Sequence, residues 1–181
     1  MGRPHAAQPV LRIVAVFSRY PDAIAWTARR LEAAWGIVAL RSPNFPFVQT
    51  DYYTPTMGGN LEKVFFALAE PADPAGLADW KLESNRWEEE YAGLAEHPEP
   101  RPLNIDPGYL TPGKLVLAST KDFAHRIYLR DGIYAETTLI YRHGRWEGHQ
   151  WTFPDYKSDT YHGFFDECRN YLRKRLREAH R

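Results

Sequence analysis

Cysteine is almost missing from this sequence. Its 181 residues include a single cysteine, Cys168, so the chain can form neither an internal disulfide bond nor a zinc site built from several cysteines. A chain without disulfides suits a reducing compartment, and we expect a cytoplasmic protein. Long apolar runs are lacking too, since the run at 11–17 is broken by Ser18 and Arg19. We therefore expect neither a membrane span nor a secretory signal.

An excess of charge of either sign is also missing. Lysine plus arginine and aspartate plus glutamate number 23 each. Such a chain has no overall field that would draw it to nucleic acid or anionic lipid, so any anion site has to be local. The sequence has no GxxxxGK followed by Ser or Thr, no GxSxG and no HExxH. The segment 119–122, STKD, is only superficially like the guanine-specificity loop of GTPases, and the missing phosphate-binding motif argues against a classical P-loop GTPase.

The first part of the chain alternates between strand and helix patterns. In chain order the expected elements are a strand at 11–17, a helix at 21–36, extended segments at 37–40 and 45–53, a strand at 61–70, a helix capped by Asp73 that runs past Tyr91, and a strand at 102–110. This is the βαββαβ order of a ferredoxin-like unit.

The second part is typical of an antiparallel meander. Strand patterns at 114–120, 125–129, 133–141 and 149–153 are separated by the turn signals Pro112-Gly113, Asp131-Gly132 and His143-Gly144, and an amphipathic helix follows from Asp159. We therefore predict one α+β domain at 11–181 with an antiparallel-rich sheet, a β-meander and a C-terminal helix, preceded by a flexible segment at 1–10. Whether the two parts share a sheet stays open at this point.

The turn at Asp131-Gly132 suggests a polar site. A two-residue type I′ turn there places Ile127 opposite Glu136 and His125 opposite Thr138, so that His125 and Glu136 are diagonal neighbours on one face. The turn at 143–144 adds His149 to the same face. Two imidazoles and a carboxylate can form a structural hydrogen bond, an acid/base or anion-binding pair, or a metal site.

Three further motifs combine acidic and aromatic residues. The DPGY segment, 106–109, has the signature of a type II turn, which either reverses the chain or aims Asp106 and Tyr109 into a cleft. TDYY, 50–53, and WTFPDY, 151–156, place Tyr52, Asp155 and Tyr156 at strand ends. Such aromatics usually pack in the core or at its rim, and they can also hydrogen-bond a sugar or base.

These motifs together resemble a known family. The segments TDYYTPTMGG (50–59), 103–141 and WTFPDY are similar to the bacterial and archaeal family of domains of unknown function numbered 4416, over nearly the whole chain. The resemblance implies a compact cytosolic domain without an established activity. Some members carry a GTP-binding label, for which the missing P-loop gives no support. The family's motif positions fall here on Asp51, Tyr52, Tyr53, Met57, Gly58, Asn104, Asp106, Pro107, Gly108, Tyr109, Lys121, His125, Arg126, Glu136, Thr138, Trp151, Asp155 and Tyr156.

Three positions depart from the family's pattern. Thr56 stands where an acidic residue is expected, Phe153 stands where Tyr is usual, and His149 lies outside the pattern. The last departure weakens the metal alternative more than it weakens the pair His125 and Glu136.

The leading hypothesis is a cleft for a small anionic ligand, phosphorylated or nucleotide-like. In it Lys121 and Arg126 neutralise the ligand's charge, Glu136 orients His125 as an acid/base group, and Asp106 joins them from the preceding turn; Tyr109, Tyr52, Asp155 and Tyr156 complete the predicted site. Two alternatives remain. One is a non-enzymatic module that binds a partner protein, and the other is RNA contact through the basic run RKRLREAHR, although nucleic acid is disfavoured because that run lies on the solvated side of a helix. The sequence identifies no reaction and no cofactor.

Overall fold

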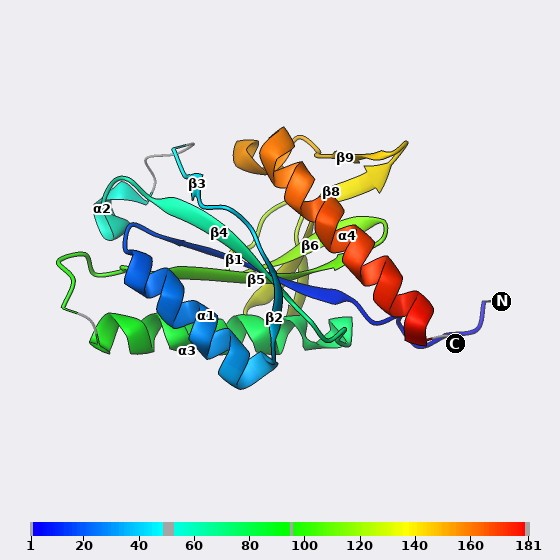
Figure 1. Ribbon diagram of the computed structural model, residues 1–181, viewed down its shortest axis with the longest axis horizontal. Coiled ribbons are helices and arrows are strands. Elements are labelled where there is room, and N and C mark those ends of the chain that lie inside the picture. The colour runs from blue at the N-terminus through cyan, green and yellow to red at the C-terminus, as the bar shows by residue number, and fades with distance from the viewer. Residues whose placement is uncertain (1, 49–52, 95, 180–181) are drawn as a thin grey trace.

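The computed structural model describes residues 2–48, 53–94 and 96–179 (Figure 1). In chain order its elements are β1 (Leu11–Ser18), α1 (Pro21–Trp35), β2 (Val38–Arg41), β3 (Phe45–Pro46), α2 (Thr54–Met57), β4 (Glu62–Leu68), the 3₁₀ turn η1 (Pro74–Gly76), α3 (Leu77–Leu94), β5 (Asn104–Thr111), β6 (Lys114–Ser119), β7 (Ile127–Arg130), β8 (Ile133–Arg142), β9 (Arg145–Glu147), the 3₁₀ turn η2 (Pro154–Lys157) and α4 (Asp159–Ala179).

All of these strands join one antiparallel sheet. Its order is β2-β4-β1-β5-β6-β8-β7, with β3 added to β4 and β9 added to β8. The first part has β1 between β4 and β5, with β2 outside β4, which is the ferredoxin-like arrangement expected for the βαββαβ order. The meander continues the same sheet from β5, so the α+β prediction is confirmed and the question of a shared sheet is answered.

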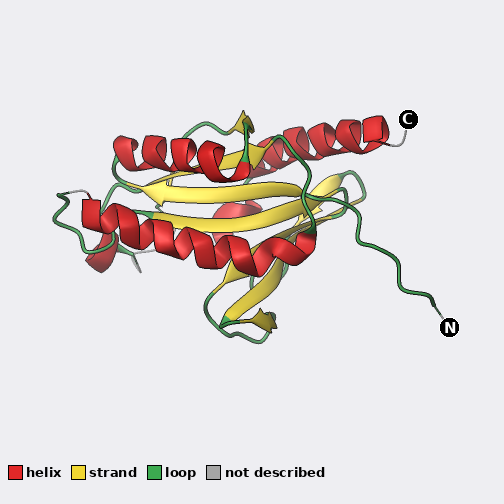
Figure 2. Ribbon diagram, turned by 90° about the horizontal axis from the view of Figure 1, so that it is seen from below, coloured by secondary structure: helices red, strands yellow, loops and turns green. Residues whose placement is uncertain are grey.

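Helices cover both faces of the sheet. Helices α1 and α3 lie on one face and α4 crosses the other (Figures 1 and 2). Strand β1 shows why, because its alternate residues are apolar on both sides: Val14 and Val16 pack in the core under α1 and α3, while Ile13 and Ala15 pack in the core under α4. Val10 already pairs with Ala72 through two backbone hydrogen bonds. Flexibility of the residues before it stays a prediction.

The DPGY segment is not a turn, contrary to the prediction. Asp106 to Tyr109 lie inside β5 and pair with β1 along their whole length. Glycine is needed at position 108 for close approach rather than for a turn, since a Cβ there would lie 2.3 Å from the carbonyl oxygen of Val116. Pairing with β6 ends at Gly108 and Leu117, and the next residue, Pro107, has no N–H to donate. Strands β5 and β6 therefore separate beyond this point.

The meander departs from the predicted register. Asp131 and Gly132 both have positive φ, as a type I′ turn requires, and Arg130 pairs with Ile133 as expected. An irregularity between Tyr128 and Arg130 then shifts the pairing by one residue, so Ile127 lies opposite Ala135 instead of Glu136. The second turn also forms, but its strand is β9, and the predicted strand at 149–153 is a loop.

Candidate functional site

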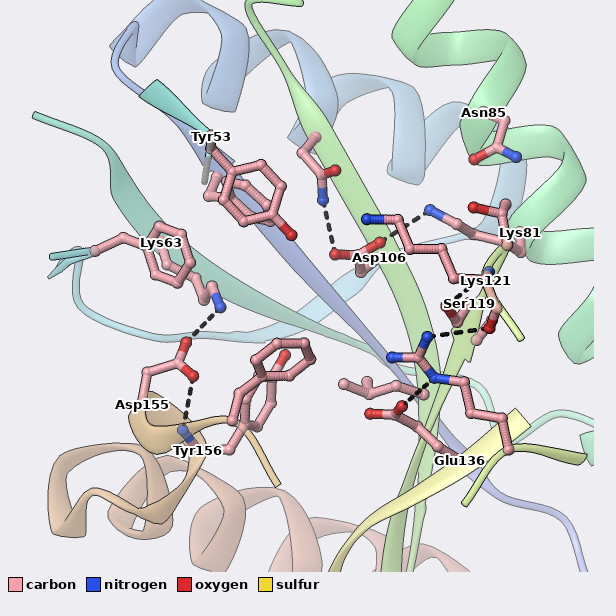
Figure 3. Close-up of a pocket in the computed structure, with 18 of the residues that line it drawn as sticks. Tyr53, Lys63, Lys81, Asn85, Asp106, Ser119, Lys121, Glu136, Asp155 and Tyr156 are labelled. Atoms are coloured by element: carbon pink, nitrogen blue, oxygen red, sulfur yellow. Dashed lines mark hydrogen bonds and ion pairs between the residues drawn. The ribbon is translucent and has the colours of Figure 1, made fainter. Parts of the chain in front are cut away.

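A cavity of about 160 Å³ opens where β5 and β6 separate (Figure 3). Because the sheet is split there, side chains from α3 on one face and from η2 on the other line the same space. The lining residues are Phe17, Phe47, Tyr53, Lys63, Lys81, Asn85, Arg101, Asn104, Asp106, Leu117, Ala118, Ser119, Thr120, Lys121, Arg126, Glu136, Phe153, Asp155 and Tyr156.

One wall contains a buried ion pair. Lys63 of β4 lies 2.5 Å from Asp155 of η2, and their side chains are 5% and 6% exposed. The Lys63 ammonium also lies over the rings of Phe47, at 4.2 Å from the centroid, and Tyr156, at 4.9 Å. Burial lowers the pKa of Lys63, although Asp155 works in the opposite direction.

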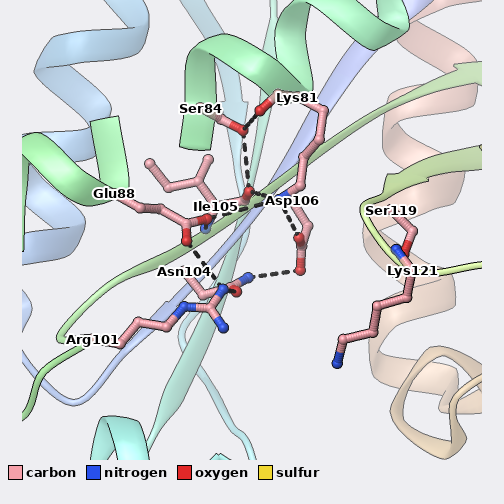
Figure 4. Close-up of polar contacts among 9 residues, drawn as sticks. All are labelled: Lys81, Ser84, Glu88, Arg101, Asn104, Ile105, Asp106, Ser119 and Lys121. Carbon is pink, nitrogen blue, oxygen red and sulfur yellow. Dashed lines mark hydrogen bonds and ion pairs between the residues drawn. The ribbon is translucent and has the colours of Figure 1, made fainter. Parts of the chain in front are cut away.

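A second buried lysine reaches the cavity from the other face of the sheet. Lys81 of α3 donates to the carbonyl oxygen of Ile105 at 2.8 Å and to Asp106 Oδ1 at 2.9 Å (Figure 4). Asn104 Nδ2 donates to the other Asp106 oxygen at 2.7 Å. Burial of the Asp106 carboxyl works to raise its pKa, but the charge of Lys81 and the hydrogen bonds from Lys81 and Asn104 outweigh burial, and the pKa lies below its ordinary value.

Glu88 links this lysine to an arginine in the cavity wall. Its Oε1 accepts from the backbone N–H of Ile105 at 2.7 Å, and its Oε2 accepts from Arg101 at 3.1 Å. Arg101 also bonds the Asn104 side chain, and Figure 4 shows Lys121 facing this network. Burial raises the pKa of Glu88 against the attraction of Lys81 and Arg101.

Four residues that form these contacts were not predicted from the sequence: Lys63, Lys81, Glu88 and Arg101. One signal was present. Lys81 and Glu88 occupy the same helical stripe as Leu77, Ser84 and Tyr91, at spacings of three and four residues. A charged residue on the buried stripe of an amphipathic helix indicates a buried partner, because an unpaired charge there is costly.

Glu136 of β8 holds together the residues predicted from the hairpin. It accepts from Arg126 Nε at 2.6 Å, from His125 Nε2 at 3.0 Å and from Thr138 Oγ1 at 3.3 Å. The side chains of His125 and Arg126 are each 10% exposed and that of Glu136 is 5% exposed. The predicted contact between His125 and Glu136 is confirmed, although His125 precedes β7 and reaches Glu136 from the loop.

His125 itself lies outside the lining of the cavity. Its ring stacks on Trp151 with centroids 5.3 Å apart and lies 5.4 Å from the ring of His149. His149 bonds the carbonyl oxygen of Thr137 through Nε2 and accepts from the Trp151 N–H through Nδ1, so both of its nitrogens are used by the backbone. Within the described ranges, no group of three or more His, Cys, Asp or Glu side chains has the geometry of a metal site.

The other predicted residues separate into three sets. Six of them line the same cavity: Asp106, Lys121, Arg126, Glu136, Asp155 and Tyr156. Tyr109 packs against the core under α1 and α3 and is not among the lining residues. Tyr52 lies outside the described residues.

No helix in the described parts of the chain is long and apolar enough to cross a membrane.

Comparison with known proteins assigns the chain to a family. Neither the comparison with curated proteins nor that with solved structures gives a match. A family profile matches residues 8–171, which is most of the chain and includes every cavity wall described above. The chain therefore belongs to the family described as a domain of unknown function, DUF4416.

Proposed function

We propose that the cavity binds a small anionic ligand that carries a phosphate group. The observation that carries this proposal is the convergence of cationic side chains on one space: Lys63, Lys81, Arg101, Lys121 and Arg126 all line it. They outnumber the carboxylates of the lining, which are Asp106, Glu136 and Asp155. Lysine and arginine are the usual partners of phosphate oxygens.

Arg126 is prepared for such a ligand. Its Nε donates to Glu136 and one of its terminal nitrogens donates to the carbonyl oxygen of Lys121 at 3.0 Å. A guanidinium has five N–H donors in a fixed plane, so these two contacts orient the group and leave further donors for ligand oxygens. His125 contacts Glu136 but does not line the cavity, so in this proposal it acts through the Glu136 carboxylate. Asp106 lines the cavity and faces the ligand directly.

The size of the cavity favours a small compound. Drug-sized ligands occupy pockets of roughly 300 to 1,000 Å³. At about 160 Å³ the cavity suits a sugar phosphate or the phosphate end of a mononucleotide better than a dinucleotide.

Thermal unfolding in the presence of phosphorylated compounds tests the proposal. A panel of inorganic phosphate, glycerol phosphate, sugar phosphates and nucleoside monophosphates should contain compounds that raise the unfolding temperature increasingly with concentration, because a ligand of the native state stabilises it by mass action. Arg126→Gln and Lys121→Gln should remove the shift, while Arg145→Gln, at a side chain 75% exposed and outside the cavity, should keep it. A panel without any shift, or one in which all three variants respond alike, refutes the proposal.

A second candidate function is a module that binds a partner protein. Strand β7 lies at one edge of the sheet, and Ile127, Tyr128 and nearby Phe123 are 71%, 58% and 55% exposed. An exposed apolar edge strand is a common site of protein association. Ile127→Lys should then weaken capture of the partner without changing the response to phosphate compounds, and unchanged capture contradicts this candidate.

RNA contact through α4 stays a prediction. Arg175, in the basic run of α4, contacts Glu70, which follows β4, and Glu178 of the same helix. These two carboxylates reduce the positive charge of the run. Binding that falls steeply with salt and is lost when Arg173 and Lys174 are neutralised would support it.

A further inference from the structure

The Lys63 ammonium has few polar partners and little contact with solvent, which anion binding alone does not require. An ammonium group has three N–H donors, yet among the residues that the structure describes its one hydrogen-bond acceptor is Asp155. The rings of Phe17, Phe47, Tyr156 and Tyr161 surround the group, and Asp106 acts on it only through its charge. With its side chain only 5% exposed, the group has lost most of the water that favours its charged form.

The second buried lysine of the cavity is held differently. Lys81 donates to both Ile105 and Asp106, and Glu88 lies 3.8 Å away. Lys81 therefore has polar partners on several sides, whereas the polar contact of Lys63 is with Asp155 and burial lowers the Lys63 pKa. A lysine becomes nucleophilic only when it is unprotonated, and desolvation is one of the ways in which proteins prepare a lysine for reaction with carbonyl compounds.

We propose that Lys63 is a reactive amine that forms a Schiff base with a small phosphorylated aldehyde or ketone. This inference rests on the anion-binding function proposed above and names the class of ligand. Figure 3 shows Lys63 and Lys121 on opposite sides of the cavity. A short ligand can therefore place its phosphate near Lys121 and Arg126 and its carbonyl carbon at Lys63.

Asp155 supplies the proton transfer that this step needs. Its carboxylate, 2.5 Å from Lys63, takes one proton from the ammonium, and the free amine attacks the carbonyl carbon. The carbon–oxygen bond then breaks, and the oxygen leaves as water with the two hydrogens that remained on the nitrogen. The proton on Asp155 returns to the nitrogen, so the product is a protonated Schiff base paired with the same carboxylate. No oxidant or reductant takes part.

Reductive trapping tests the inference on the wild-type protein. The chain is incubated with glycolaldehyde phosphate and sodium cyanoborohydride, digested, and its lysines are examined by peptide mass spectrometry. The adduct should form mainly on Lys63, should be suppressed by excess inorganic phosphate, and should be weaker with glycolaldehyde, which has no phosphate. Adducts confined to exposed lysines such as Lys114 and Lys157, with none on Lys63, overturn the inference.

Two further measurements make the result specific. Lys63→Arg should abolish the phosphate-sensitive adduct and Lys114→Arg should leave it unchanged, but the wild-type labelling pattern is decisive even if the first variant fails to fold. Thermal stabilisation by glycolaldehyde phosphate without the reductant reports binding separately. Stabilisation without a Lys63 adduct overturns the covalent step and leaves anion binding intact, whereas the failure of both, together with the failure of the wider panel, overturns both proposals.

Discussion

The ammonium of Lys63 lies 2.5 Å from the carboxylate of Asp155, and about 95% of each side chain is buried. Removing one partner of such a pair leaves the other charge buried without compensation, which typically costs about 3 to 5 kcal/mol. We therefore predict that Asp155→Asn lowers the free energy of unfolding by about that amount, as measured by urea denaturation.

An exposed ion pair provides the control. Arg30 and Glu90 join α1 to α3 with side chains 41% and 39% exposed. Because solvent screens such a pair, Glu90→Gln should cost less than about 1 kcal/mol. Similar losses in Asp155→Asn and Glu90→Gln would show that the buried pair contributes no more than a surface contact.

The network around Lys81 predicts two opposite pH dependences. The folded state lowers the pKa of Asp106, so the stability this residue contributes is present above its unfolded value, about 3.9, and is lost as the pH falls through the still lower folded value. The folded state raises the pKa of Glu88, so its contribution is present below the unfolded value, about 4.3, and is lost as the pH rises through the folded value.

Two amide variants separate these effects. Asp106→Asn should flatten the loss of unfolding free energy below about pH 4. Glu88→Gln should instead remove the gain in stability that the wild-type protein shows as the pH falls towards about 4.3. The measurement is urea denaturation at several pH values between about 3 and 8. The quantity to compare is the slope of the unfolding free energy against pH rather than its absolute value. Parallel curves for both variants and the wild type contradict this account.

The close approach of β5 to β6 predicts a costly glycine substitution. A Cβ at position 108 would lie 2.3 Å from the carbonyl oxygen of Val116 and 2.6 Å from a methyl carbon of Leu117. Because the carbonyl belongs to a paired backbone, Gly108→Ala should lower stability by about 1 to 3 kcal/mol or more. Gly113→Ala, in the hairpin that joins the same two strands, meets nothing within 4 Å and should be nearly neutral when the two variants are compared by thermal unfolding. Equal effects at the two glycines would falsify the steric explanation.

Much of the fold followed from local patterns. The helical spacing of Ile24, Leu31 and Trp35, and the positive φ needed at Asp131 and Gly132, report interactions within a few residues, and each is found as expected. The DPGY segment was misjudged because its proline and glycine respond to a neighbouring strand. Position 108 needs a glycine because the carbonyl oxygen of Val116 in β6 leaves no room for a Cβ, and the local sequence does not show this contact.

The candidate site was predictable only where it depends on one hairpin. His125, Arg126 and Glu136 lie within twelve residues of one another, and turn chemistry brought them together even though the exact register was wrong. Lys63 and Asp155 are 92 residues apart and meet because η2 lies against the face of the sheet on which Lys63 of β4 projects. No local signal links such residues, so their pairing emerges only from the folded chain.

Substitution of His125 tests whether the contacts of Glu136 with His125 and Arg126 serve ligand binding or only stability. Its Nε2 bonds Glu136 at 3.0 Å, while its buried Nδ1 has no hydrogen-bond partner among the described residues. His125→Ala should lower the free energy of unfolding by about 1 to 3 kcal/mol, because Glu136 loses a buried donor. It should also weaken the binding of inorganic phosphate, measured by titration calorimetry, because Glu136 then holds Arg126 less firmly. His125→Gln keeps an N–H near the position of Nε2 and should recover part of both losses.

Trp151→Leu provides the matched control for this prediction. It removes the ring that stacks on His125 at 5.3 Å but leaves the bond between His125 and Glu136 in place. We expect lower stability with unchanged phosphate affinity, since the tryptophan contacts neither Glu136 nor the cavity lining through any described hydrogen bond. If His125→Ala behaves like Trp151→Leu, with stability lowered and affinity intact, then the contact between His125 and Glu136 is structural and the phosphate site depends on Arg126 and the buried lysines alone.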